Sequence, residues 1–170
     1  MIIMTTVLLL AGGKSIRMGQ DKAMMKGGIF RFRNIYSSLG VNRIITLCGD
    51  ESRINSFEGE VWSDPNGISG PLELIKWCLN QIEDDLQIIP CDAFELLDTG
   101  AKWLLDQKNG VPIDNNMIRQ PLMVRISNRE LIDHEAPTIN GLFAKFPSLE
   151  GFEFPHQFSN FNSKSELIEK

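Results

Sequence analysis

Residues 4–23, MTTVLLLAGGKSIRMGQDKA, place an apolar segment directly before a glycine-rich, basic loop. Residues 7–10 have the length and composition of a buried strand. Gly12 and Gly13 let backbone N–H groups approach an anion without an intervening Cβ, and the cations of the loop are Lys14, Arg17 and Lys22. Loops of this composition at the carboxyl end of a strand hold nucleotide phosphates in α/β proteins. The sequence therefore predicts a polyphosphate site.

Two common phosphate-binding motifs are excluded by the spacing of the glycines. A Walker loop ending at Gly13-Lys14-Ser15 needs a glycine five positions before Gly13, where this chain has Leu8. A dinucleotide fingerprint needs the register G-x-G-x-x-G, whereas the glycines here are residues 12, 13 and 19. The loop therefore belongs to a different class of phosphate site.

The pattern that remains, L-A-G-G-x-S-x-R-M-G-x-D-K-A, closely resembles the signature of the sugar-nucleotidyltransferase-like enzymes, and within them the molybdenum cofactor guanylyltransferases. The resemblance implies a three-layer α/β/α, Rossmann-like nucleotidyltransferase fold with a mainly parallel, mixed central sheet. It also implies transfer of GMP from GTP to molybdopterin-bound molybdenum cofactor, with release of pyrophosphate. The related cytidylyl enzymes tend to have L-A-A-G, so Ala11-Gly12-Gly13 favours guanine.

Composition and charge indicate one domain that binds a small ligand. A chain of 170 residues with 42% hydrophobic content suits a single domain spanning residues 1–170. A net charge of −5 disfavours nucleic acid as a partner. The apolar first ten residues are too short a run to cross a membrane and lack a targeting pattern. The odd number of cysteines, 3, without metal-type spacing, predicts free thiols and a cytoplasmic location.

Strand and helix patterns alternate along the first two thirds of the chain, which predicts a mainly parallel sheet covered on both faces. Strands are expected at residues 7–10, 43–47 and 86–89. A helix is expected after Ser69 as N-cap and Pro71 in the first turn, and a second over residues 94–105.

The pattern is weaker beyond residue 110. The expected elements are strands at 111–113 and 122–126, short helices at 129–134 and 138–146, a strand at 152–154, and a final helix whose capping box is residues 163–166.

Ser63-Asp64-Pro65, followed by Ser69-Gly70-Pro71-Leu72, resembles the D-x-x-x-x-x-G-P-L segment of the same family. Gly70 permits close backbone approach, and the helix that follows offers a free N-terminus. Asp64 is able to accept hydrogen bonds from a base or a ribose. An ordinary Asp-Pro turn is the alternative interpretation.

Ile88-Ile89-Pro90-Cys91-Asp92 resembles the family's strand ending in P-C-D, where its magnesium ligand lies. A carboxylate at the carboxyl end of a buried strand suits Mg²⁺ that bridges phosphates. The alternative is that Asp92 caps a helix beginning near Phe94, and the two roles are compatible.

Two later motifs point to the acceptor. Arg119-Gln120-Pro121-Leu122 resembles the R-x-Q/H-P-L entry into a late strand, and Arg119 is either a phosphate contact or a solvated surface group. Asn160-Phe161-Asn162 resembles the family's N-x-N close, near the metal and acceptor, or is turn chemistry. Together with Gly70 and Pro71, these residues form the predicted acceptor site.

For catalysis we expect Arg17 and Lys22 to bind the triphosphate and Asp92 to hold Mg²⁺. The predicted nucleotide site consists of Leu10, Ala11, Gly12, Gly13, Lys22, Asp64 and Asp92. The expected partners are GTP, molybdopterin and, by resemblance, cofactor-biosynthesis or molybdoenzyme-chaperone proteins.

Three segments depart from the family pattern. Leu47 stands where a small polar residue is usual, residues 24–39 are shortened, and Ala93-Phe94-Glu95 replaces T-P-F after Asp92. These departures leave two alternatives open: a nucleotidyltransferase with another nucleotide or acceptor, such as CTP, a phosphosugar or cobinamide, and a non-catalytic adaptor that binds nucleotide or molybdopterin.

Overall fold

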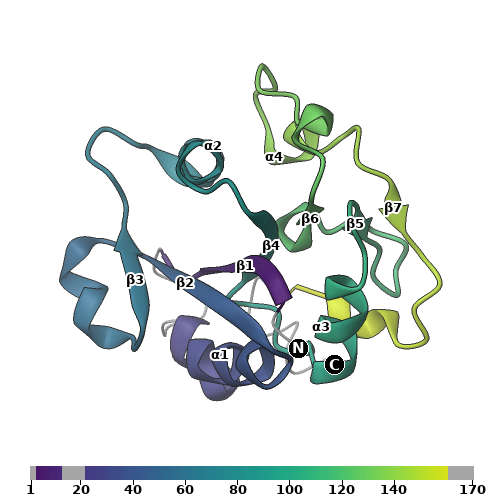
Figure 1. Cartoon of the computed structure of the whole chain (residues 1–170), viewed down its shortest axis with the longest axis horizontal. Helices are drawn as coiled ribbons and strands as arrows, with labels where there is room; N and C mark the ends of the chain where they lie inside the picture. The colour runs from purple at the N-terminus through teal and green to yellow at the C-terminus, as the bar shows by residue number, and fades with distance from the viewer. Residues whose placement is uncertain (1–2, 13–21, 161–170) are drawn as a thin grey trace.

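The computed structural model describes residues 3–12 and 22–160 of the chain, and its centre is a mixed, mostly parallel sheet (Figure 1). The strand order is β3-β2-β1-β4-β6, with β1 parallel to β2 and β4, β2 parallel to β3, and β6 antiparallel to β4. The strands are β1 (Ile3–Leu10), β2 (Val41–Gly49), β3 (Glu60–Ser63), β4 (Asp85–Pro90) and β6 (Arg125–Ile126). The predicted mainly parallel, mixed sheet is confirmed.

Helices cover both faces of this sheet, as Figure 1 shows. One face carries α1 (Gly28–Ser38) and α3 (Asp98–Leu105), and the other carries α2 (Gly70–Gln81). Because side chains alternate along a strand, Val7 and Leu9 of β1 pack in the core with α1 and α3, whereas Leu8 packs in the core with α2. The three-layer α/β/α prediction is therefore confirmed.

The predicted start of α2 is confirmed, although a different side chain caps it. Ser69 is the N-cap residue and a proline, Pro71, lies in the first turn, but the Ser69 hydroxyl makes no capping bond. Instead, the Glu73 carboxylate accepts a hydrogen bond from the Ser69 N–H at 2.9 Å. This bond resembles the reciprocal half of a capping box, but Glu73 is the fourth helical residue, one position beyond the capping-box position.

Several elements after residue 110 differ from the prediction. The two strands expected at 111–113 and 122–126 are shorter than predicted and cover only residues 111–112 and 125–126. Residues 129–131 form a 3₁₀ turn, and no strand covers residues 152–154. Phe152 packs instead against the rings of Trp103 and Phe158, at centroid distances of 5.3 and 5.2 Å. The expected final helix lies outside the described residues. The elements observed are η4 (Pro121–Met123), η5 (Arg129–Leu131), α4 (Ile139–Leu142), η6 (Pro155–Phe158), and the two-stranded parallel pair β5 (Val111–Pro112) and β7 (Ser148–Leu149).

Side chains bond several backbone groups in and around this region. The Asn109 carboxamide oxygen accepts hydrogen bonds from the N–H groups of Ser127 and Asn128, at 2.8 and 2.7 Å. The buried Arg125 guanidinium donates to the carbonyls of Leu86, Leu105 and Gln107. Backbone groups satisfied in this way need no neighbouring strand.

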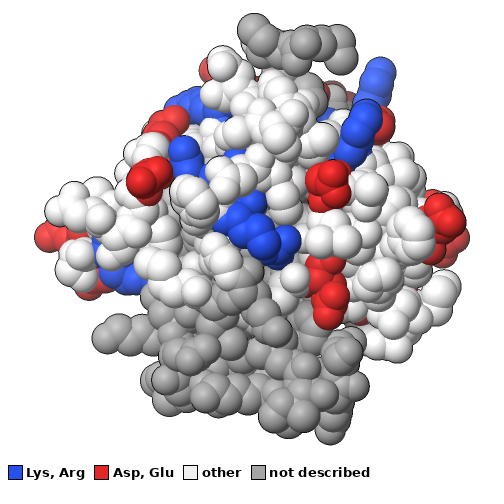
Figure 2. Space-filling view, turned by 90° about the horizontal axis from the view of Figure 1, so that it is seen from below, with Lys and Arg blue, Asp and Glu red and all other residues white. Residues whose placement is uncertain are grey.

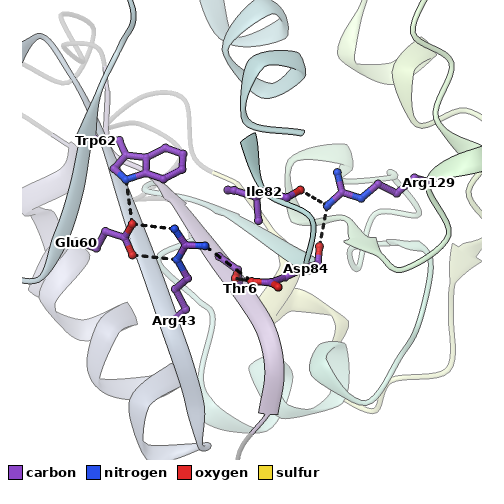
Figure 3. Close-up of polar contacts among 7 residues, drawn as sticks. All are labelled: Thr6, Arg43, Glu60, Trp62, Ile82, Asp84 and Arg129. Carbon is purple, nitrogen blue, oxygen red and sulfur yellow. Dashed lines mark hydrogen bonds and ion pairs between the residues drawn. The ribbon is translucent and has the colours of Figure 1, made fainter. Parts of the chain in front are cut away.

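A polar network joins the strands near their amino ends (Figure 3). The Arg43 guanidinium donates two hydrogen bonds to the Glu60 carboxylate, at 3.1 and 3.0 Å, and Trp62 Nε1 donates to the same group. The Asp84 carboxylate, just before β4, accepts from the Thr6 hydroxyl at 2.7 Å. The opposite, carboxyl edge of the parallel strands is where α/β sheets bind ligands.

The three thiols are free, as the sequence predicts. Cys48 and Cys78 are buried, and Cys91 is half-buried. Burial raises the pKa of the Cys78 thiol to about 12, so this group behaves as an apolar core side chain.

The surface of the described residues mixes charges of both signs. On the face seen in Figure 2, Lys and Arg side chains are interspersed with Asp and Glu. None of the helices in the described ranges is both long and apolar enough to cross a membrane.

Candidate functional site

A pocket of about 290 Å³ opens at the carboxyl edge of the sheet, between the ends of β1 and β2 and the start of α2. It gathers five of the predicted site residues, although they come from distant parts of the sequence. The lining residues are Leu10, Gly12, Leu47, Asp64, Gly70, Pro71, Leu74 and Ile75. The structure therefore brings together the start of the glycine loop and the D-x-x-x-x-x-G-P-L segment.

The backbone where β1 ends is held by neighbours on both sides. The Ala11 N–H donates to the Leu47 carbonyl at 2.8 Å, and the Leu10 carbonyl accepts from the Cys91 N–H at 3.1 Å. Because the Ala11 N–H already has a partner in β2, it is not a spare donor for a base. Rigid anchoring at this point fixes the direction in which the glycine loop leaves the sheet.

Arg53 completes this anchoring, and sequence analysis did not identify it. It lies in η3 (Glu51–Ser56), and its Nη1 donates to the carbonyls of Ala11 and Cys48, at 2.6 and 2.9 Å. Its guanidinium carbon lies 5.4 Å from the centroid of the Phe57 ring. The residue ties the end of β1 to the end of β2 and places a positive charge at the base of the loop.

Gly12 packs closely against another part of the chain. A Cβ built on Gly12 would lie 3.2 Å from Gly49 Cα and 3.3 Å from Gly49 N, which is tighter than most real contacts of a Cβ. The end of β1 and the end of β2 therefore approach backbone to backbone. Gly49 itself has a φ of 82°, a conformation that favours glycine.

Asp64 lines the pocket and follows β3 directly. Its N–H donates to the Gly49 carbonyl at 2.7 Å, which holds the turn against the end of β2. Desolvation raises the pKa of the Asp64 carboxyl above its usual value. Gly70 has a φ of 84° with open space around its Cα, so backbone conformation is what requires glycine at this position.

Asp92 lies two residues beyond β4, beside the end of β1. Leu10 and Pro90 are partners in the parallel ladder, and Cys91 bonds to Leu10, so Asp92 occupies the point where β1 has neighbours on both sides. In an open α/β sheet, ligands bind at the point where the strand order reverses, beside a strand that has neighbours on both sides. Asp92 is not among the residues that line the 290 Å³ pocket.

The alternative role of Asp92 as a helix cap is wrong. Helix α3 begins at Asp98, because residues 90–96 form two successive turns with bonds from Ala93 N to Pro90 O and from Leu96 N to Ala93 O. The capping acceptor is the Gln157 carboxamide oxygen, which accepts from the N–H groups of Leu97 and Gly100.

The donor chemistry at Asp92 fits Mg²⁺. Within residues 3–12 and 22–160, no group of three or more His, Cys, Asp or Glu side chains is arranged to hold a metal. Mg²⁺ is commonly held by one or two carboxylates, with substrate phosphates and water completing its octahedral shell. A single carboxylate at the end of a strand is therefore compatible with Mg²⁺ whose other ligands are substrate phosphates and water.

Other predicted residues fall outside what the structure describes or away from the pocket. Gly13, Arg17 and Asn162 lie outside the described residues, and Lys22 begins η2 (Lys22–Gly27) without a described side chain. Arg119 donates to Ser148 Oγ and to two carbonyls in residues 143–146, so its guanidinium holds the chain between α4 and β7. These bonds account for Arg119 without a ligand.

Asn160 ends the described chain within a hydrogen-bonded side-chain series. Its Nδ2 donates to Gln120 Oε1 at 2.6 Å, and Gln120 Nε2 donates to Asp114 Oδ2 at 2.8 Å. The Asn160 Oδ1 atom is buried and has no hydrogen-bond partner among the described residues. Asn160 does not line the 290 Å³ pocket, and its predicted contact with the acceptor stays a prediction.

A pocket at the carboxyl edge of a mainly parallel sheet, beside a glycine loop and a strand-end carboxylate, defines a nucleotide-binding α/β protein. The model of the MobA-like NTP transferase domain matches residues 7–136. The chain therefore belongs to the MobA-like NTP transferase family.

Curated relatives and solved structures agree with this assignment. The chain is 35% identical over 94 residues to probable molybdenum cofactor guanylyltransferases from two Synechococcus strains. That match covers 50% of this chain and 48% of each relative, so the chain spans about half the length of the curated relatives it matches.

Solved structures extend the likeness in fold to nearly the whole chain. Molybdopterin-guanine dinucleotide biosynthesis protein A from Archaeoglobus fulgidus aligns with a TM-score of 0.67 at 17% identity, covering 96% of this chain and 95% of that one. A putative protein from Aquifex aeolicus VF5 aligns with a TM-score of 0.68 at 18% identity, covering 93% of each chain.

Proposed function

We propose that this protein transfers GMP from GTP to molybdopterin-bound molybdenum cofactor and releases pyrophosphate. The observation that carries the proposal is the pocket, because it gathers Leu10, Gly12, Asp64, Gly70 and Pro71 from two motifs about fifty residues apart in the sequence. Membership of the family and the L-A-G-G form of the loop support a nucleotidyltransferase with guanine as the base. The cytoplasmic location and the chaperone-type protein partners remain predictions.

The electrostatics of the reaction define what the protein has to supply. An acceptor phosphate oxygen attacks the α-phosphorus of the nucleotide in line, and pyrophosphate leaves. Each uncompensated pair of unit charges about 4 Å apart costs about 4 kcal/mol at an effective dielectric constant near 20. Bringing two phosphates together therefore requires cations more than it requires a general base.

Lys22 and Arg17 meet this requirement in the proposal, since both belong to the loop that follows β1. In the same proposal the backbone N–H groups of Gly12 and Gly13 would contact the phosphates, and the bonds of Ala11 to Leu47 and Arg53 fix where the chain leaves β1. Asp92 would hold Mg²⁺, which when bound neutralises charge on the α- and β-phosphates.

Asp64 and Leu47 set the environment of the base in the same proposal. Leu47, Leu74 and Ile75 supply apolar pocket wall for one face of the ring. The Asp64 carboxylate accepts hydrogen bonds from the N–H groups of guanine or from ribose hydroxyls. Desolvation raises the pKa of this carboxyl, and a donor placed against it would favour the charged form and oppose that shift.

The nucleotide is tested by thermal stabilisation of the purified chain with GTP, CTP, UTP or ATP, each with Mg²⁺. We expect GTP to raise the Tm most, because only a bound ligand stabilises the folded state. Stabilisation by CTP alone contradicts the guanine assignment and favours the cytidylyl alternative. The reaction is tested by pyrophosphate release with GTP and molybdopterin, and an adaptor that binds without catalysis releases none.

The catalytic assignment is tested with Lys22→Ala and Asp92→Ala. We expect each to abolish pyrophosphate release while the Tm falls little, since both residues belong to loop segments at the ligand edge. Lys102→Ala and Asp106→Ala are the matched controls, because this exposed pair lies at the end of α3 with an Nζ–Oδ2 distance of 3.0 Å. Wild-type rates in both Lys22→Ala and Asp92→Ala would show that the catalytic residues are elsewhere.

A further inference from the structure

Arg31 of α1 holds the segment that carries Asp92. Its Nη1 donates to the Leu96 carbonyl at 2.5 Å, and its Nη2 donates to the carbonyls of Phe94 and Ala93, at 3.2 and 3.3 Å. The guanidinium carbon also lies 4.7 Å from the centroid of the Phe32 ring. One planar side chain therefore bonds three carbonyls within four consecutive residues.

These bonds secure the middle of the connection between β4 and α3. Its beginning is fixed by the bond from Cys91 N to Leu10 O, and its end by the Gln157 carboxamide, which accepts from Leu97 N. Between these two points, Ala93 and Leu96 are fully buried in the core beneath α1. Asp92 is adjacent to Ala93, the first of the residues whose carbonyl Arg31 binds.

Arg31 also belongs to the segment that follows the other predicted catalytic residue. Lys22 begins η2, η2 ends at Gly27, and α1 begins at the next residue, Gly28. A bond from α1 to residues 93–96 therefore links the segment of Lys22 to the segment of Asp92.

We propose that Arg31 is a positioning residue, which fixes the Asp92 segment relative to the Lys22 segment so that the carboxylate is preorganised for a nucleotide-bound divalent cation. This inference rests on the proposed function at the same site. Arg31 acts through the backbone of residues 93–96 and needs no contact with substrate. Removing a group that hydrogen-bonds a metal ligand directly typically changes metal affinity about 10–100-fold, and Arg31 acts one residue further along the backbone, so we expect an effect toward the lower end of that range.

Arg129 provides a matched control at the other end of β4. Its guanidinium likewise bonds three carbonyls, those of Leu79, Ile82 and Asp84, at 2.6–2.7 Å. Figure 3 shows it against residues 82 and 84, at the amino end of the strand. Arg129→Ala therefore removes the same number and kind of bonds without touching the segment that carries Asp92.

The experiment compares wild type, Arg31→Ala, Arg31→Lys and Arg129→Ala. Mn²⁺ binding in the presence of GTP is measured by electron paramagnetic resonance, the Mg²⁺ concentration for half-maximal pyrophosphate release by kinetics, and folding by the Tm. We expect Arg31→Ala to weaken Mn²⁺ binding and raise the half-saturating Mg²⁺ concentration about 10-fold or more. Arg31→Lys, which keeps the charge but has a single ammonium group, is expected to lie between Arg31→Ala and wild type.

Arg129→Ala is expected to lower the Tm and leave both metal measurements within about 2-fold of wild type. The inference is overturned if folded Arg31→Ala or Arg31→Lys binds Mn²⁺ as wild type does, or if Arg129→Ala weakens metal binding equally. Should Arg31→Ala not fold, Arg31→Lys decides the question. Failure of the proposed function is a separate result, because wild type would then release no pyrophosphate, while Mn²⁺ binding with GTP still compares the variants.

Discussion

Replacement of Gln157 by alanine tests how the C-terminal part of the chain holds the helix that follows the Asp92 segment. Gln157 is 2% exposed and lies in η6 against the start of α3. Its Oε1 accepts from the N–H groups of Leu97 and Gly100, at 3.1 and 2.9 Å, and its Nε2 donates to Thr99 Oγ1 at 2.9 Å. One carboxamide from sixty residues away thus acts as the cap of this helix.

The cost of Gln157→Ala follows from these contacts. Gly100 is buried, so its N–H loses its acceptor out of reach of water, which costs about 1–3 kcal/mol. Leu97 is exposed, and water replaces most of what its N–H loses. Loss of a helix cap typically costs about 0.5–2 kcal/mol, and this value already includes part of the cost of the unsatisfied Gly100 N–H. We therefore expect the free energy of unfolding to fall by about 2–3 kcal/mol.

Urea denaturation followed by circular dichroism measures this change. With a urea m-value of about 2 kcal/mol/M, the midpoint should fall by about 1–1.5 M. Gln107→Ala is the control, because Gln107 lies just after the other end of α3 and its half-buried side chain makes one bond, from Nε2 to the Trp103 carbonyl at 3.0 Å. If Gln157→Ala costs no more than Gln107→Ala, the capping argument is refuted.

Two further substitutions test buried and paired groups. The buried Tyr36 hydroxyl has no hydrogen-bond partner among the described residues, so Tyr36→Phe should leave the free energy of unfolding unchanged or raise it by up to about 1 kcal/mol. A clear loss of stability, measured by calorimetry, would show that the Tyr36 hydroxyl has a hydrogen-bond partner. Arg43 lowers the pKa of Glu60, so the stability from this pair is present above the ordinary glutamate pKa and is lost as pH falls through the lowered value. Glu60→Gln should cost at most about 1 kcal/mol at pH 7 and nothing at pH 2, and equal losses at both pH values would contradict the assignment.

The central sheet was predictable because its strands carry their own signals. Residues 7–10, 43–47 and 86–89 are rich in large apolar and β-branched residues, and each lies inside an observed parallel strand whose apolar side chains are mostly buried. Strand β3 was missed because it has four residues, Glu60–Ser63, and none of them is fully buried. It exists through its pairing with β2, which no local pattern records.

The region after residue 110 was predicted less well for a related reason. Several of its backbone groups are bonded by the side chains of Asn109 and Arg119, whose partners lie 18 or more residues away along the chain. Apolar residues in this region fill the core without forming regular elements, as Phe143 and Phe146 do, with ring centroids 5.5 Å apart. The spacing of apolar residues therefore predicts little of the secondary structure in this region.

Some residues of the candidate site were likewise predictable from the sequence, and others were not. Glycines, strand-end carboxylates and the G-P-L turn have fixed local geometry, so their positions in the sequence located the pocket. Arg31 and Arg53 could not be recognised, because an arginine that binds carbonyls in the folded protein looks in the sequence like any surface cation. Their roles depend on which loops the fold brings beside them.

The close backbone approach of Gly12 and Gly49 makes these two positions interdependent. A Cβ at residue 12 would lie 3.2 Å from Gly49 Cα, so a larger residue there requires the end of β2 to shift slightly. The two residues are far apart in the sequence but adjacent in space. Substitutions at them are therefore expected to be epistatic, because the effect of a change at residue 12 depends on how far the strand end at residue 49 can move.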